Sequence, residues 1–196
     1  MCLLLETIRV KDGRFCHLKY HQERMNQTRA VLFPGSGLLD IGAFEIPVAF
    51  SSGIFKCRIV YDRDFREIEF LTYTPKRIDS LHLVEAENLK YPFKLLDRSG
   101  IETLQKDFRE SEEIILVQKG VITDTSYSNL AFLSENQWFT PDKPLLNGTC
   151  RQRLISQGML TQTRITPETI ALYSHVSLIN SMLGLTDLML PVSSIH

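Results

Sequence analysis

Alternation of apolar and polar residues predicts several short strands in the first half of the chain. Leu3 to Val10 is a strand candidate that ends at Asp12-Gly13, a pair typical of turns. Residues 55–61 alternate as well, with Cys57, Ile59 and Tyr61 on one side, and residues 68–73 follow after a polar turn. This spacing predicts a β-hairpin, and Leu81 to Val84 predicts a further short strand.

Helix signals separate these strands and continue into the second half. Residues 20–32 form a charged helical stretch that ends before Pro34. Asp40 is a candidate cap for a short helix that Pro47 interrupts. Ser99 and Glu102 have capping-box spacing, which predicts a helix with Ser99 as its N-cap. Further helices are predicted from Gly148 to 157 and from Thr166-Pro167, and further strands at 113–118, 121–124, 129–133, 138–140 and 175–179.

The order of these elements indicates an α+β protein of two domains. The apolar pattern breaks between 85 and 92, so we expect an N-terminal α/β domain over 1–86 and a larger C-terminal domain over 87–196. The sequence has 196 residues, 43% of them hydrophobic and 23% charged, which is typical of a globular enzyme. The net charge of −1 gives no sign of a nucleic-acid partner.

Cysteine usage and apolar run lengths indicate the compartment. The four cysteines have no CxxC pair, which favours reduced thiols in the cytoplasm over disulfides or a zinc ribbon. The apolar run before Glu6 has no basic residue ahead of it, so we interpret it as a strand and not a signal peptide. No apolar stretch approaches the length of a membrane span.

Lys94 is a candidate for covalent chemistry because apolar residues flank it. It lies in the stretch Tyr91-Pro92-Phe93-Lys94-Leu95-Leu96, and desolvation disfavours the charged form of an amine. A neutral amine is the form that attacks a carbonyl. The alternative is an amphipathic edge from which Lys94 extends into water, and local context alone favours that alternative.

Three other positions are candidates for chemistry. Gly148-Thr149-Cys150 at a predicted helix start offers backbone N–H groups that suit a phosphate, although a plain N-cap is commoner. Arg24 could supply a guanidinium to the same phosphate, or lie exposed. Asp124 lies in a polar segment that, taken alone, indicates only a turn.

Several other motifs are set aside. Cys16, His17 and His21 have no second half that would complete a zinc site, so no metal is expected. The glycines around Ser36 lack the residues of a nucleotide-binding loop, and no G-x-S-x-G motif is present.

Taken in order, five motifs resemble the class IV aminotransferase family, the fold-type IV enzymes that use pyridoxal 5′-phosphate (PLP). The motifs extend from residue 4 to the C-terminal region, over nearly the whole chain. They are Leu5-Glu6-Thr7-Ile8, Tyr20-His21-Gln22-Glu23-Arg24, Lys94 with Asp97-Arg98, Asp124 to Leu130, and Thr140-Pro141 with Leu146 to Arg151. The family includes branched-chain and D-amino-acid aminotransferases and aminodeoxychorismate lyase, and its fold joins a small α/β domain to a mixed-sheet pseudobarrel.

The resemblance implies a role for each matching residue. Lys94 matches the Schiff-base lysine, which also moves the α-proton, and Arg24 matches the phosphate-binding arginine. Asp124, five residues before Asn129, stands where the family has a glutamate that pairs with the pyridine nitrogen. The remaining cofactor-binding candidates are Asn129, Thr149, Cys150, Asn180 and Ser181.

The departures from the family pattern concern the choice of reaction. Asp124 is one methylene shorter than glutamate, and Cys150 replaces a threonine whose hydroxyl would bind phosphate. The chain is shorter than typical members and begins at the E-T-I strand, so the substrate side is the least transferable part.

Arg58 is a candidate clamp for a substrate carboxylate, with a solvent-facing arginine as the alternative, and Tyr73 is a second substrate candidate. The resemblance implies a homodimer that converts amino or keto acids. We expect an aminotransferase, with aminodeoxychorismate lyase or a non-catalytic PLP-binding member as alternatives.

Overall fold

The protein is described by a computed structural model covering residues 2–196, and it divides into two compact units. The first unit holds the chain up to Pro75 together with Phe93–Asp97, and the second holds Lys76–Pro92 and Arg98–His196. We expected the division after residue 86. The structure instead groups residues 80–85 with the second unit, because this strand pairs in parallel with residues 112–117.

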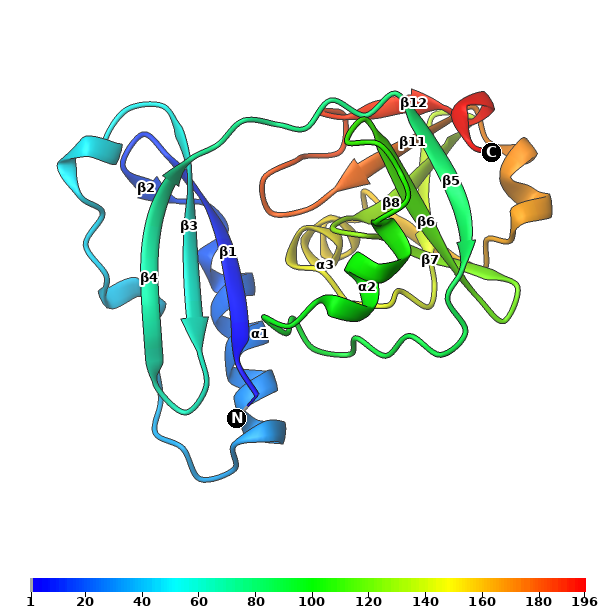
Figure 1. Cartoon of the computed structure of the whole chain (residues 1–196). Helices are drawn as coiled ribbons and strands as arrows, with labels where there is room; N and C mark the ends of the chain where they lie inside the picture. The colour runs from blue at the N-terminus through cyan, green and yellow to red at the C-terminus, as the bar shows by residue number, and fades with distance from the viewer. Residues whose placement is uncertain (1) are drawn as a thin grey trace. The chain divides into compact units, whose positions relative to one another are not determined.

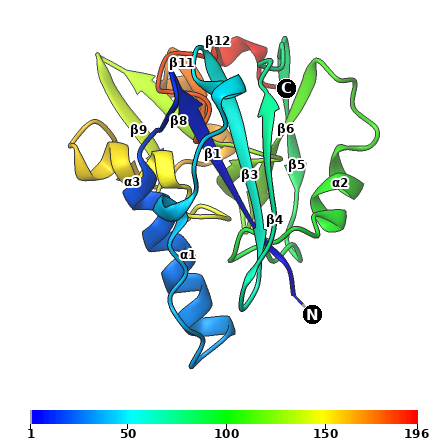
Figure 2. The same ribbon diagram turned by 90° about the vertical axis from the view of Figure 1, so that its left-hand side faces the viewer.

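The first unit is a four-stranded antiparallel sheet with one long helix on a single face (Figures 1 and 2). The strand order is β2-β1-β3-β4. The elements are β1 (Leu4–Lys11), β2 (Arg14–Phe15), α1 (Leu18–Leu32), β3 (Ile54–Tyr61) and β4 (Phe65–Thr72), with short 3₁₀ turns at Ile41–Ala43 and Val48–Phe50. The hairpin predicted around residue 62 is confirmed as β3–β4.

Alternation along β1 determines which face of the sheet is buried. Leu4, Ile8 and Val10 are fully buried and pack with Met25 of α1. On β3 the predicted inward set of Cys57, Ile59 and Tyr61 joins the same core. Glu6 occupies the inward position between Leu4 and Ile8 and is also fully buried, which places a carboxylate beneath the helix.

The second unit is built on a mixed sheet in the order β10-β9-β8-β7-β6-β5, and β11 pairs with both β8 and β12. This confirms the expected α+β class. The strands are β5 (Ser80–Glu85), β6 (Glu112–Gln118), β7 (Val121–Thr125), β8 (Asn129–Ser134), β9 (Gln137–Pro141), β10 (Thr161–Thr163), β11 (His175–Ile179) and β12 (Met189–Pro191). The helices are α2 (Ser99–Gln105) and α3 (Thr149–Ser156), with 3₁₀ turns at Pro167–Leu172 and Val192–Ser194.

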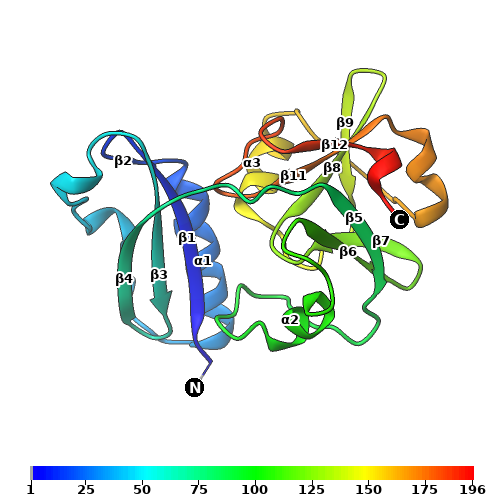
Figure 3. The same cartoon turned by 45° about the horizontal axis from the view of Figure 1, so that its top comes forward.

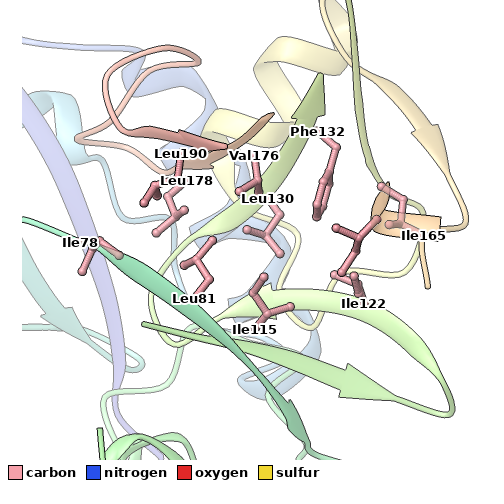
Figure 4. Packing of buried hydrophobic residues seen from close by; sticks show 11 residues of the cluster. Ile78, Leu81, Ile115, Ile122, Leu130, Phe132, Ile165, Val176, Leu178 and Leu190 are labelled. Atoms are coloured by element: carbon pink, nitrogen blue, oxygen red, sulfur yellow. The ribbon is translucent and has the colours of Figure 1, made fainter. Parts of the chain in front are cut away.

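The core of this unit packs against β8, which has neighbours on three strands. Leu130 and Phe132 of β8 lie with Ile115, Ile122 and Val176 in one buried cluster (Figure 4). The C-terminal end of the chain runs beside β5 (Figure 3), where Leu83 N–H donates to the His196 carbonyl over 2.9 Å.

Two of the five predicted helix starts differ from the structure, and the other three are confirmed. Ser99 is not the N-cap of α2; Arg98 holds that position, and the predicted capping box is absent. The helix α1 begins at Leu18, two residues before the predicted start, and its N-cap is His17 in the left-handed region with φ 54°. Asp40 does cap the turn at Ile41–Ala43 by accepting from Gly42 N–H. No helix within residues 2–196 is long and apolar enough to cross a membrane.

Candidate functional site

Lys94 is held by its backbone against the edge of β1. The Leu5 N–H donates to the Lys94 carbonyl over 2.9 Å, and the Leu96 N–H donates to the Leu3 carbonyl over 2.9 Å. Leu95 pairs with Leu4 in an antiparallel bridge and packs, with Phe93, against the core of the first unit. The backbone of Lys94 therefore has a fixed position, and its side chain is half-buried.

Arg24 lies on α1, where it pairs with the buried carboxylate of β1. Arg24 Nε donates to Glu6 Oε1 over 2.8 Å, and Arg24 Nη2 donates to Glu6 Oε2 over 2.5 Å. His21, one helical turn earlier, places Nδ1 2.6 Å from the same Oε2. The side chains of Glu6, His21 and Arg24 are 0%, 2% and 11% exposed, so this ionic cluster is almost completely shielded from water.

The electrostatics of this cluster determine the protonation state of each member. Burial alone would raise the pKa of Glu6, but the Arg24 charge and the hydrogen bonds from His21 and Arg24 outweigh it and hold that pKa at about 2. Burial lowers the pKa of His21, and the charges of Arg24 and Lys94 lower it further against the opposing effect of Glu6. At neutral pH the cluster therefore holds ionised Glu6 and a neutral His21, whose Nδ1–H donates to the carboxylate.

Sequence reasoning did not identify Glu6 as a functional position. A signal for it was present, because an acidic residue on the apolar side of an alternating strand needs a buried partner. The partner lay on α1, and sequence spacing alone does not show which helix covers which strand.

On the second unit, Asp124 is a buried carboxylate whose hydrogen-bond donors are uncharged. Asp124 and Asn129 stand opposite each other across the β7–β8 turn, and Asn129 Nδ2 donates to Asp124 Oδ1 over 2.7 Å. The Leu146 N–H donates to Asp124 Oδ2 over 2.7 Å. Burial raises the pKa of Asp124 to about 7, although the hydrogen bonds from Leu146, Asn129 and Leu145 and the nearby Arg151 charge oppose this shift.

Gly148 precedes α3 at a position that has no space for a side chain. A Cβ built there would lie 2.1 Å from Asn129 Oδ1, the amide that also holds Asp124. As N-cap, Gly148 has no side chain to bind the first N–H groups of the helix. A helix N-terminus of this kind favours an anion, both through its exposed N–H groups and through the helix dipole.

Thr149 and Cys150 open α3 and are both buried. The Cys150 thiol lies 3.7 Å from the Leu183 carbonyl and 3.6 Å from Arg153 Nη2, so its sulfur contacts the protein interior. Burial raises the pKa of this thiol. Any contact of Cys150 with an anion is therefore expected through its backbone N–H.

Asn180 and Ser181 follow β11 in a tight turn. Asn180 Oδ1 accepts from the N–H groups of Met182 and Leu183, and its Nδ2 donates to Ser128 Oγ over 2.9 Å. These bonds tie the turn to the start of β8. Asn180 is thus engaged in holding local structure, and half-buried Ser181 is the more available side chain of the two for a ligand.

A second contact missed from sequence fixes the turn between Asp124 and Asn129. Glu113 of β6 accepts from the Ser126 N–H over 2.9 Å, and Arg98 Nη2 donates to the Ser126 carbonyl over 2.5 Å. Glu113 and Arg98 therefore hold the N–H and the carbonyl of Ser126. These two bonds restrain the turn between the strands that carry Asp124 and Asn129.

The two substrate candidates lie in the first unit. Arg58 Nη1 pairs with Glu69 over 2.8 Å and with Glu67 over 3.2 Å on β4, so its guanidinium is engaged by the neighbouring strand. This favours the surface ion-pair alternative over a carboxylate clamp. Tyr73 is half-buried, just after β4. Within residues 2–196, no three His, Cys, Asp or Glu side chains are grouped as a metal site.

Comparison with known proteins places these features in a family. The sequence model of "Amino-transferase class IV" matches residues 59–195. An uncharacterised protein of Haemophilus influenzae is 30% identical over 185 residues, covering 93% of this chain and 98% of that protein.

Two solved structures share the fold. A candidate 4-amino-4-deoxychorismate lyase of Haemophilus somnus is 32% identical with a TM-score of 0.82, covering 94% of this chain and 98% of that one. The PLP-bound form of a hypothetical aminotransferase of Mycobacterium tuberculosis is 18% identical with a TM-score of 0.75, covering 98% of this chain and 81% of that one. The family match spans more than half of the sequence, and the chain belongs to the class IV aminotransferase family, whose cofactor is pyridoxal 5′-phosphate.

Proposed function

We propose that the chain is a PLP-dependent enzyme that acts on amino-acid-like substrates with Lys94 as its reactive amine. The observation that carries the proposal is the Asp124 carboxylate, which is buried and whose hydrogen-bond donors are all uncharged. A buried carboxylate is costly unless a positive charge lies beside it. A protonated ring nitrogen is such a charge, and its presence would lower the pKa of Asp124 again.

The residues around Asp124 fit the rest of the cofactor's chemistry. Asn129 and the Leu146 N–H orient the carboxylate and leave it acceptor capacity for one more N–H. The start of α3 supplies N–H groups for a phosphate, and Gly148 permits close backbone packing there. We assign Thr149, the Cys150 N–H and Ser181 to the phosphate on this basis, and we assign Arg24 to it on the family resemblance.

Lys94 is suited to carry a proton because its backbone is fixed. When bound, PLP supplies an electron sink for charge that develops at the substrate's α-carbon. Lys94 Nζ would take the α-proton and return it, a task that requires a positioned amine in its neutral form. The hydrogen bonds of the Lys94 and Leu96 backbones to β1 provide that positioning.

Aminotransfer is the reaction we favour. Aminotransfer requires a proton to be removed at the substrate's α-carbon and returned at the C4′ carbon of the cofactor. Lys94 alone can serve both positions. Aminodeoxychorismate lyase is the second candidate, supported by the 32% identical candidate lyase that matches 94% of this chain. The resemblance also supports a homodimer, which sedimentation of the purified protein would test.

A substrate screen distinguishes these reactions. The purified protein, saturated with PLP, is mixed with L-amino acids, D-amino acids or aminodeoxychorismate, and the cofactor's absorbance band and the products are followed. Aminotransfer predicts loss of the band with release of one keto acid per site. Lyase activity predicts pyruvate and 4-aminobenzoate with the band retained. A band that responds to none of these compounds would contradict the proposal and indicate a non-catalytic PLP-binding protein.

A further inference from the structure

We propose that Glu6 is a positioning residue that orients the Arg24 guanidinium for the cofactor's phosphate. The inference rests on the proposed role of Arg24 in phosphate binding. It adds Glu6, a residue that has no part in the function proposed above. Glu6 lies on β1 and Arg24 on α1, so their pair joins the strand to the helix inside one unit.

The pairing geometry fixes the guanidinium in its plane. Nε and Nη2 of Arg24 each donate to a separate oxygen of Glu6, over 2.8 Å and 2.5 Å. Such a two-bond fork allows neither rotation of the guanidinium nor sliding along the carboxylate. The direction of Nη1, the nitrogen outside this fork, is thereby set as well.

His21 fixes the carboxylate in turn. Its Nδ1 lies 2.6 Å from Glu6 Oε2, and its side chain is 2% exposed. His21 and Arg24 are three residues apart on α1, which places both on the same helix face. Glu6 is therefore held from two points of one rigid helix.

The position of Glu6 on β1 indicates that the Glu6–Arg24 ion pair does more than stabilise the fold. The neighbouring inward positions of β1 are Leu4 and Ile8. An apolar residue in place of Glu6 could be buried there in the same way, without the cost of burying a charge. Buried ion pairs give little or no net stability compared with apolar side chains of similar volume. A carboxylate at this position is best explained by what it does to Arg24.

The test separates the contribution of the phosphate group to cofactor binding from the contribution of the rest of the cofactor. Dissociation constants for PLP and for pyridoxal, which lacks the phosphate, are measured by absorbance on the cofactor-free protein. Their ratio is compared among wild type, Glu6→Gln, Arg24→Lys and the double variant. Binding of inorganic phosphate to the cofactor-free protein gives a second readout that needs no activity.

The matched control is Glu23→Gln. Glu23 is the neighbour of Arg24 on α1, but its side chain is 47% exposed and pairs with Lys19 over 3.7 Å. This variant removes a negative charge from the same helix without touching the fork. Thermal melting shows which variants are folded, and Glu6→Asp, which keeps the charge but shortens its reach, replaces Glu6→Gln if the latter does not fold.

We expect Glu6→Gln to weaken PLP and phosphate binding by about tenfold, the scale of one charged hydrogen bond, with pyridoxal binding unchanged. Arg24→Lys should do the same, the double variant should add little, and Glu23→Gln should match wild type. A loss in Arg24→Lys without one in Glu6→Gln overturns the inference and leaves the role of Arg24 intact. No loss in either variant overturns both.

Discussion

Asp124 departs from the family pattern by one methylene, and the structure shows how its carboxylate is held. It is shorter than the glutamate that the resemblance implies, yet the β7–β8 turn places it directly opposite Asn129, which orients it. Its raised pKa is the consequence of burying a carboxylate between uncharged donors. The length of the side chain was visible in the sequence; its burial was not.

Replacing Asp124 by asparagine tests this burial through pH. The pKa of Asp124 in the folded protein, about 7, lies above its ordinary value of 3.8, so the folded state holds the proton more tightly than the unfolded state does. Stability contributed by this group is therefore present below pH 4 and lost as pH rises towards 7. The asparagine of Asp124→Asn cannot ionise, so the variant should not lose stability over this pH range.

The measurement is urea unfolding of both cofactor-free proteins at several pH values. We expect the free energy of unfolding of Asp124→Asn, relative to wild type, to rise by a few kcal/mol between pH 4 and pH 8. A difference that stays constant with pH would mean that the carboxylate is not desolvated.

At the level of elements, the start of α3 depends on Gly148. An added Cβ would displace the Asn129 amide, which also binds Asp124 and the Leu146 carbonyl. We expect Gly148→Ala to cost about 1–3 kcal/mol of stability, the range for overpacking a buried contact, and to weaken PLP retention as well.

Gly37→Ala is the matched control for this substitution, because a Cβ at Gly37 meets no atom within 4 Å. Calorimetric melting with and without PLP measures both effects. Equal melting temperatures for Gly148→Ala and Gly37→Ala would show that the contact with Asn129 relaxes without cost.

Elements whose pattern is local were predictable from sequence, and those that depend on distant contacts were not. The β3–β4 hairpin follows from alternation around one turn, and its inward residues were identified correctly. The capping box at Ser99 was wrong because the helix starts at Ser99 itself, whose carbonyl accepts from the Thr103 hydroxyl. Spacing of residue types cannot show which residue begins the helix.

At the scale of the whole molecule, the division into units follows strand pairing and not chain order. Residues 80–85 belong with the second unit through their parallel pairing with β6, and Phe93–Asp97 belong with the first through β1. Neither partnership leaves a local signal. The candidate residues accordingly fall into two groups, with Arg24 and Lys94 on the first unit and Asp124, Asn129 and the start of α3 on the second.

Covalent trapping of PLP tests whether Lys94 is the lysine that holds the cofactor. The protein is mixed with PLP, reduced with borohydride to make the bond permanent, digested and analysed by mass spectrometry. Lys90, an exposed lysine four residues away, serves as the internal comparison, and Lys94→Ala as the variant control. We expect one label per chain, on Lys94, and none on Lys94→Ala. A label on another lysine, or equal labelling of the variant, would contradict it.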